Sequence, residues 1–191
     1  MLVEKGTVEG TLIINPDCYG DHRGWFMETY TKKKYEAMGI TTEFIQCNMS
    51  MSARKGTIRG IHYQKDPMSQ AKLVRCVSGV VLDVCVDLRV GSPTYLKWEA
   101  VELSLEKNNQ FYIPRGCGHG FITLTDDVLF EYMVDNYYSK EHDGGIRYND
   151  PAIGVDWEGL LNGLEPVLSE KDTAAPLLKD SDCHFVYKEE K

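Results

Sequence analysis

Residues 73–89 show a regular pattern of apolar and polar positions. The segment is rich in valine and is interrupted at Gly79. After the glycine the side chains alternate between two faces: Asp83, Cys85 and Asp87 on the first, and Leu82, Val84, Val86 and Leu88 on the second. A period of two with many β-branched residues predicts β-strand.

Further short segments have the same character, and turn residues separate them. We predict strands at residues 10–15, 98–103, 110–113, 120–124 and 128–136. The turns are indicated by Gly91-Ser92-Pro93, Asn108-Asn109 and Asp126-Asp127. Several short strands at regular spacing favour an all-β sandwich or barrel. We also predict one helix at residues 32–38, and loops with short helical turns outside the barrel from residue 137 onward.

The size and composition of the chain are those of an ordinary globular domain. It has 191 residues, 42% of them hydrophobic and 26% charged, so we expect one domain over residues 1–191. The net charge of −8, without a Lys/Arg-rich run, argues against a nucleic-acid partner. No segment resembles a signal peptide or is apolar enough to span a membrane. Six cysteines without a C-x-x-C pair indicate reduced, mostly buried thiols in a cytoplasmic protein.

Two glycine–histidine motifs resemble the paired motifs of the cupin superfamily. The first places Gly56 six residues before His62, and the second is the P-x-G-x-x-H pattern from Pro114 to His119. A block of strands punctuated by glycines separates them. This resemblance implies a cupin-type jelly-roll barrel or sandwich with a few short peripheral helices.

The residues that hold a metal in many cupins are replaced here. Gln64 stands where metal-binding cupins have a second histidine, and Lys72 stands where they have a glutamate. An amide is a poor ligand, and an ammonium has no lone pair to give. His62 and His119 beside a cation are not expected to bind a divalent metal tightly. We therefore predict a cavity without a metal that is used for organic acid–base chemistry.

Three polar side chains are predicted to point into the barrel. Tyr132 shares the apolar face of its strand, where a tyrosine is more often a core residue than a functional one. Lys72 shares a face with Val74 and Cys76, and a buried lysine needs a partner or a function. His62 is compatible with either a core or a functional role.

Other segments supply groups suited to a phosphorylated sugar ligand. Arg23 and Glu28 lie near aromatic residues, Gln46 and Asn48 add amides, and Arg59 lies close to His62. Arginine suits bidentate phosphate binding. Taken singly, each of these groups is compatible with an ordinary solvated surface position.

Together, these segments closely resemble the dTDP-4-dehydrorhamnose 3,5-epimerase family. The similarity runs in family order over almost the whole chain. The matching stretches are residues 20–26 (GDHRGWF), 58–64 (IRGIHYQ), 72–76 (KLVRC), 83–89 (DVCVDLR), 92–94 (SPT), 113–116 (IPRG), 119–121 (HGF), 149–151 (NDP) and 168–172 (LSEKD). The resemblance implies epimerisation of dTDP-4-dehydro-6-deoxy-D-glucose at C3 and C5, in dTDP-L-rhamnose synthesis, by a homodimer that needs no cofactor. An exposed edge at the predicted strand 10–15 would also favour pairing with a second copy.

The resemblance also assigns roles to matching residues. It implies that His62 is the catalytic base, Tyr132 the opposing acid, Asp172 the carboxylate that orients the histidine, and Lys72 the cation beside the developing enolate. It implies substrate binding by a larger group of residues. These are Arg23, Glu28, Gln46, Asn48, Arg59, Lys72, His119, Asp143 and Lys171.

Three alternative functions follow from the same residues. A related enzyme that acts only at C3 or C5, or a ketoisomerase, would share the barrel and the histidine, although Tyr132 favours double epimerisation. A metal-dependent cupin is disfavoured by Gln64 and Lys72. A non-catalytic sugar-nucleotide-binding protein would not need His62, Lys72, Tyr132 and Asp172 together.

Overall fold

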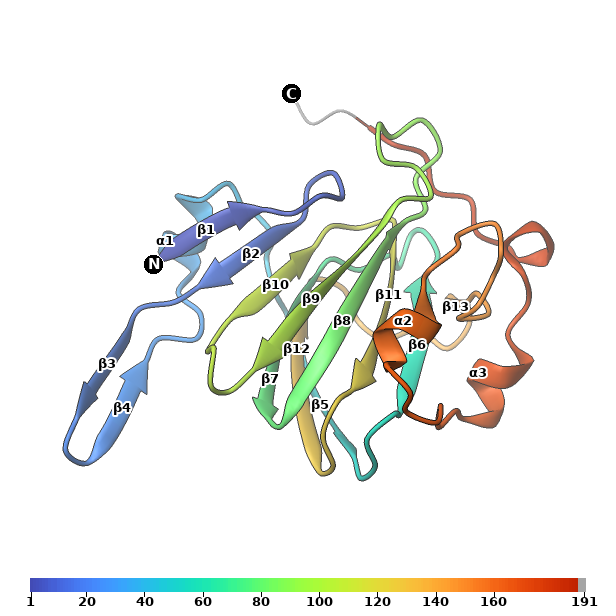
Figure 1. Ribbon diagram of the computed structural model, residues 1–191. Helices are drawn as coiled ribbons and strands as arrows, with labels where there is room; N and C mark the ends of the chain where they lie inside the picture. The colour runs from blue at the N-terminus through green and yellow to red at the C-terminus, as the bar shows by residue number, and fades with distance from the viewer. Residues whose placement is uncertain (189–191) are drawn as a thin grey trace.

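The protein is built mainly from two β-sheets that enclose a common core (Figure 1). The computed structural model describes residues 1–188. The six-stranded sheet has the order β1-β2-β10-β7-β12-β5, and the five-stranded sheet has the order β13-β6-β11-β8-β9. The strands of the first are β1 (Leu2–Lys5), β2 (Leu12–Asn15), β5 (Gln46–Ser52), β7 (Lys72–Ser78), β10 (Gln110–Ile113) and β12 (Val128–Val134). The strands of the second are β6 (Ile58–Gln64), β8 (Val80–Asp87), β9 (Trp98–Ser104), β11 (Cys117–Thr123) and β13 (Asp143–Gly145).

The all-β class and the predicted strands are confirmed. The valine-rich segment forms β7 and β8, which separate at Gly79, where φ is +80°. The strand predicted at residues 10–15 is β2, but the expectation that it leaves an exposed edge is wrong. It lies between β1 and β10, because the N-terminal segment folds back on it. The alternating pattern finds strands but does not show their neighbours.

The apolar faces of both sheets meet in the main core. Its members come from β7, β10 and β12 on one side and from β8, β9 and β11 on the other, with Phe111, Phe121 and Phe130 among the largest. A second apolar cluster covers the outer face of the five-stranded sheet with the C-terminal segment, which carries α2 (Trp157–Leu161), α3 (Glu170–Ala174) and a short 3-10 helix (Leu178–Asp180). Helix α1 (Lys32–Glu36) contributes Tyr35 to a third cluster. Burial of these faces is the main driving force for the fold.

Strands β6 and β11 approach each other unusually closely at two glycines. A Cβ atom added to Gly60 would lie 2.5 Å from the Cα of Gly120, and φ at Gly60 is +134°. The register between the two strands shifts beside this point. Only glycine fits such a contact, because a side chain on either strand would push the two backbones apart.

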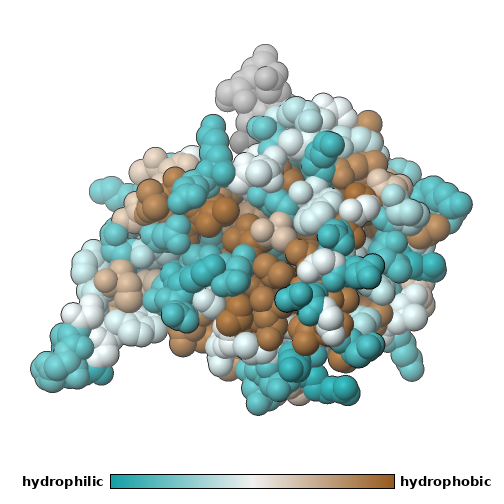
Figure 2. Space-filling view, in the orientation of Figure 1, coloured by the Kyte–Doolittle hydropathy of each residue, from teal (hydrophilic) through white to brown (hydrophobic). Residues whose placement is uncertain are grey.

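A two-stranded hairpin projects from the body of the molecule (Figure 1). It consists of β3 (Cys18–Asp21) and β4 (Gly24–Met27), and its turn is the hydrophilic tip at the lower left of Figure 2. Tyr19, Trp25 and Phe26 on this hairpin are 52–65% exposed. Figure 2 also shows apolar surface in the middle of this face, over β8 and β9. Within residues 1–188, no helix has the length and apolarity to cross a membrane.

Candidate active site

A cavity of ≈ 270 Å³ lies between the two sheets. Its inner wall is buried and includes Lys72, His119, Phe121 and Phe130, whereas its mouth is formed by more exposed residues. The full lining is Ser50, Arg59, His62, Tyr63, Gln64, Gln70, Lys72, His119, Phe121, Phe130, Tyr132, Tyr138, Asp143 and Lys171. The structure therefore brings seven of the predicted site residues to one place. A concave site with a few convergent polar groups is the usual form of a small-molecule site.

His62 is held by a carboxylate from outside the barrel. Its Nε2 lies 2.5 Å from Oδ1 of Asp172, so the other ring nitrogen, Nδ1, is left to exchange a proton with a bound molecule. Asp172 lies in the first turn of α3, and its Oδ2 accepts a hydrogen bond from the capping residue Ser169 at 2.7 Å. Burial acts to raise the pKa of Asp172, but the hydrogen bonds from His62 and Ser169 outweigh it and lower the pKa. Asp172 therefore stays ionised and fixes the orientation of His62.

The second histidine lies directly opposite the first. His119 on β11 pairs with His62 on β6, and its Nε2 lies 2.8 Å from Oδ2 of Asp83 on β8. Burial lowers the pKa of His119, and nearby Lys72 and His62 lower it further, although Asp83 opposes them. His119 is thus a neutral ring with one nitrogen committed to Asp83. The other carboxylate oxygen of Asp83, Oδ1, is buried without a hydrogen-bond partner among the described residues.

Lys72 lies on the inner wall, as its strand pattern predicts. It is buried, and this burial lowers its pKa from 10.5 to about 8, against the attraction of Asp83 and Asp143. The ammonium form therefore still predominates at pH 7. A buried cation that faces a cavity can stabilise negative charge that develops on a bound molecule.

Tyr132 approaches the cavity from the opposite sheet to His62. It lies on β12, and the centroid of its ring is 6.3 Å from the centroid of the Phe130 ring. Burial is the main cause that raises the pKa of Tyr132, and Asp143 adds to it, while Arg59 opposes. The hydroxyl therefore stays protonated at neutral pH and can act as a proton donor.

Charged groups gather at the mouth of the cavity. Lys171 Nζ lies 2.5 Å from Oδ2 of Asp143, which also accepts a hydrogen bond of 3.4 Å from the Tyr138 hydroxyl. The Arg59 side chain is held by Ser52 at 3.1 Å and by the backbone of β5. This rim can bind an anionic, polar ligand while the inner wall takes a less polar part of it.

Comparisons with known proteins show the family of the chain. The sequence profile described as dTDP-4-dehydrorhamnose 3,5-epimerase matches residues 5–180. The chain belongs to the dTDP-4-dehydrorhamnose 3,5-epimerase family. It is 45% identical over 187 residues to the epimerase of that name from Sinorhizobium fredii, covering 98% of this chain and 94% of that protein.

Solved structures of this epimerase family have the same fold. A dTDP-6-deoxy-D-glucose-3,5-epimerase from Legionella pneumophila, in complex with dTDP-4-keto-L-rhamnose, matches with a TM-score of 0.91 and 42% identity over 98% of both chains. A 3′-monoepimerase from Streptomyces bikiniensis, in complex with dTDP-quinovose, matches with a TM-score of 0.83 and 36% identity, over 92% of this chain and 87% of that one. These matches confirm the predicted cupin-type fold.

Four residues that the resemblance to the epimerase family assigns to substrate binding do not line the cavity of this chain. Arg23 and Glu28 lie on or beside the projecting hairpin, where they pair with Asp21 and Lys34 respectively. On β5, Gln46 donates to Asn48 at 2.8 Å, and Ser50 is the residue of that strand that reaches the cavity.

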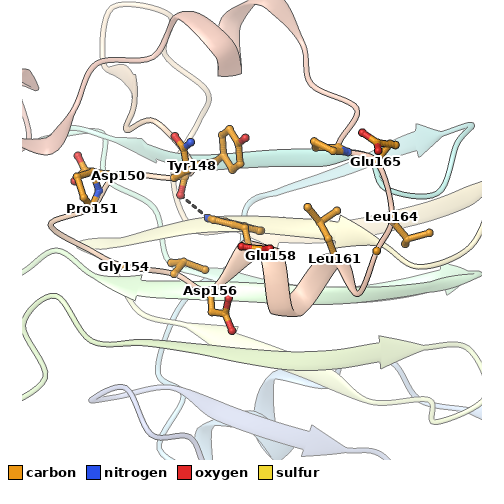
Figure 3. A pocket seen from close by; sticks show the side chains of 14 residues that line it. Tyr148, Asp150, Pro151, Gly154, Asp156, Glu158, Leu161, Leu164 and Glu165 are labelled. Atoms are coloured by element: carbon orange, nitrogen blue, oxygen red, sulfur yellow. Dashed lines mark hydrogen bonds between the residues drawn. The ribbon is translucent and has the colours of Figure 1, made fainter.

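The epimerase-family chain has a second, larger cavity that contains none of the predicted site residues (Figure 3). This cavity of ≈ 630 Å³ lies around α2 and is lined by residues between 148 and 166. Its buried carboxylate, Asp150, accepts hydrogen bonds from the backbone of Ala152 and Leu178, and Asp156 caps α2. Because these carboxylates support local backbone, the cavity between the sheets is the better candidate for the epimerase active site.

The sequence interpretation missed three residues at the epimerase site. Asp83 holds His119, and Ser169 holds Asp172. The third residue, Tyr138, lines the mouth of the cavity. Asp83 could have been found, because Val81 and Cys85, two positions away on the same face of the strand, are both apolar. Ser169 matches the preference for serine at a helix N-cap. No feature of the sequence around Tyr138 indicates that this residue lines the cavity.

Proposed function

We propose that this chain converts dTDP-4-dehydro-6-deoxy-D-glucose to dTDP-4-dehydro-L-rhamnose by inverting C3 and C5. The observation that carries this proposal is that His62 and Tyr132 line one cavity from strands of opposite sheets. The 4-keto group acidifies the adjacent C–H bonds, so a base can form an enolate. Inversion then requires a proton from the other face, and two groups on opposite walls suit that requirement.

The side chains divide the reaction between them. His62, held by Asp172, removes the proton, and Tyr132 returns one to the opposite face of the sugar. The Lys72 ammonium offsets the negative charge on the keto oxygen as the enolate forms. Arg59, His119, Asp143 and Lys171 bind the substrate around this centre. Residues 1–191 act as a single epimerase domain.

The deciding experiment is proton NMR of dTDP-4-keto-6-deoxy-glucose with the protein in D₂O. We expect deuterium at both C3 and C5 of the product, with the L-configuration. Deuterium at one carbon would instead indicate the single-site epimerase, for which the Streptomyces bikiniensis relative is a precedent. That enzyme was also solved with a histidine and a tyrosine replaced together, so a histidine–tyrosine pair does not by itself distinguish the two outcomes.

The residues at the former cupin metal position do not fit a metal. The Gln64 amide nitrogen donates to two backbone carbonyls, and Lys72 offers an ammonium in place of a carboxylate. Across residues 1–188, no group of three His, Cys, Asp or Glu side chains has the arrangement of a metal site. The donor set is therefore unsuited to tight binding of a divalent metal.

We accordingly expect full activity after prolonged treatment with a chelator. The measurement is the epimerisation rate before and after dialysis against EDTA, with metal analysis of both samples. A loss of activity that one divalent metal restores would contradict this expectation.

We further propose that the active form is a homodimer in which the hairpin packs against the partner. Tyr19 and Phe26, which pair across the hairpin, and Trp25 on its other face are exposed aromatic side chains that monomers rarely leave in water together. Docking of the hairpin near the partner's cavity would also bring Arg23 and Glu28 to a substrate. The six free thiols agree with a cytoplasmic location, which we propose as well.

Sedimentation at micromolar concentration tests the assembly. We expect a species of twice the 21.7 kDa chain mass, and we expect Phe26→Asp to shift it toward the single-chain mass because a charge replaces buried apolar surface. Wild-type protein that sediments at the single-chain mass would rule out the dimer.

A further inference from the structure

The backbone at the mouth of the cavity is pinned by Gln64. This residue follows His62 by two positions on β6 and is only 5% exposed. Its amide nitrogen donates to the carbonyls of Met68 at 2.7 Å and Tyr137 at 3.1 Å, and its amide oxygen accepts from the Ser139 N–H at 2.6 Å. The side chain thus ties two loops to the strand that carries His62.

A second amide holds the residue between these contacts. The N–H of Tyr138 donates to Oε1 of Gln46 on β5 at 3.1 Å. The backbone is therefore fixed on both sides of Tyr138, by side chains from different sheets. The Tyr138 ring itself is 59% exposed and lines the cavity mouth. An exposed aromatic ring on a loop held this firmly is a pre-organised contact surface.

The size of the cavity indicates what this surface meets. At ≈ 270 Å³, the cavity is below the range of roughly 300–1,000 Å³ typical for sites that enclose a drug-sized ligand. A nucleotide sugar with its sugar between His62 and Tyr132 must therefore extend its nucleotide beyond the cavity, whose lining at the mouth includes Tyr138 and Asp143. None of the hydrogen bonds of Gln64 involves the groups that would move protons.

We propose that Gln64 is a positioning residue for the nucleotide end of the substrate, and that it acts through the backbone on either side of Tyr138. The inference rests on the proposed function, because it needs a nucleotide at the mouth. Gln64, which stands where many cupins have a metal ligand, then holds the backbone and thereby determines the affinity for the nucleotide. Its loss weakens binding and leaves proton transfer at His62 and Tyr132 nearly intact.

The test compares Gln64→Met with a matched control, Asn109→Leu. Asn109 is a buried amide, 6% exposed, that donates to the Glu102 carbonyl at 2.8 Å and accepts from the Ser104 N–H, away from the cavity. Each variant removes a buried amide that holds the backbone by hydrogen bonds, so both should melt at a lower temperature than the wild type. We expect only Gln64→Met to raise KM and the calorimetric Kd for dTDP, by about tenfold, with kcat changed less than about twofold. Should Gln64→Met fail to fold, Gln64→Glu removes the two donated bonds and keeps the acceptor for Ser139.

A double-mutant cycle with Tyr138→Ala separates positioning from general destabilisation. If Gln64 acts through Tyr138, adding Gln64→Met to Tyr138→Ala should change the Kd for dTDP by less than about twofold. Fully additive effects, or an unchanged Kd in Gln64→Met, would overturn the proposal. Wild-type protein that does not bind dTDP would instead refute the proposed function, so the two failures are distinguishable.

Discussion

Replacement of His62 by alanine is expected to abolish both inversion and solvent deuterium incorporation. Without the imidazole no base faces the acidic C–H bonds, so no enolate forms. The expected loss of rate is at least on the order of 10²–10⁴-fold, the usual contribution of a positioned base. Asp172→Ala should behave as a weaker form of the same defect, because the ring remains but loses its orienting partner.

Tyr132→Phe is expected to separate the two half-steps. His62 can still form the enolate and return the proton to the original face, so exchange survives while inversion falls steeply. Deuterium at C3 and C5 of recovered substrate and product is the measurement, and thermal melting must first show that each variant is folded. Because only a hydroxyl is removed, the packing of the ring against Phe130 should persist. If folded His62→Ala exchanged deuterium at the wild-type rate, another residue would be the base.

Lys72→Met is expected to change activity and stability in opposite directions. Loss of the cation beside the enolate oxygen should lower kcat by roughly 10²–10³-fold, as for removal of other electrostatic groups of this kind. The buried ammonium is unfavourable for folding, since its folded pKa of about 8 is below the ordinary 10.5. The variant should therefore melt at a higher temperature than the wild type at pH 7.

The pH dependence of the wild type provides the control for Lys72. Between pH 8 and 10.5 the unfolded chain holds a proton that the folded chain has lost, so stability should rise with pH through this window relative to Lys72→Met. Activity that depends on the ammonium should fall as the pH passes about 8. A Lys72→Met variant that melts below the wild type at pH 7 would contradict the expected gain in stability. A variant in which kcat still falls above about pH 8, as in the wild type, would contradict the role of the ammonium in activity.

The sequence predicted the inner wall of the site better than its rim. Lys72 and Tyr132 were placed correctly because a strand has a fixed period, so an apolar neighbour two positions away identifies the inward face. The position of Asp172 behind His62 came from the family resemblance, since 110 residues separate the two. No local pattern reports which distant segments meet, and this limits what periodicity can predict.

Two of the matched stretches, residues 83–89 and 92–94, have a structural role as well. Asp87 accepts hydrogen bonds from Arg89, Ser92 and Thr94, which closes the turn between β8 and β9. Hairpin residues such as Arg23 show a different limit. Arg23 pairs with Asp21 on the hairpin and lies outside the cavity of its own chain, and no local pattern in the sequence indicates this.

The glycine contact between β6 and β11 separates two properties that usually change together, the stability of the core and the spacing of the active-site histidines. His62 lies two residues after Gly60 and His119 lies directly before Gly120, so this contact sets the spacing of their backbones, while the His119 ring also stacks on Phe130 of the core. Core positions that do not touch His119 can therefore accumulate volume-conserving substitutions, with modest changes in stability, while the two backbones keep their separation. Alanine at either glycine would have the opposite effect. Over evolutionary time, these two positions without side chains should restrict variation as strongly as the histidines they space.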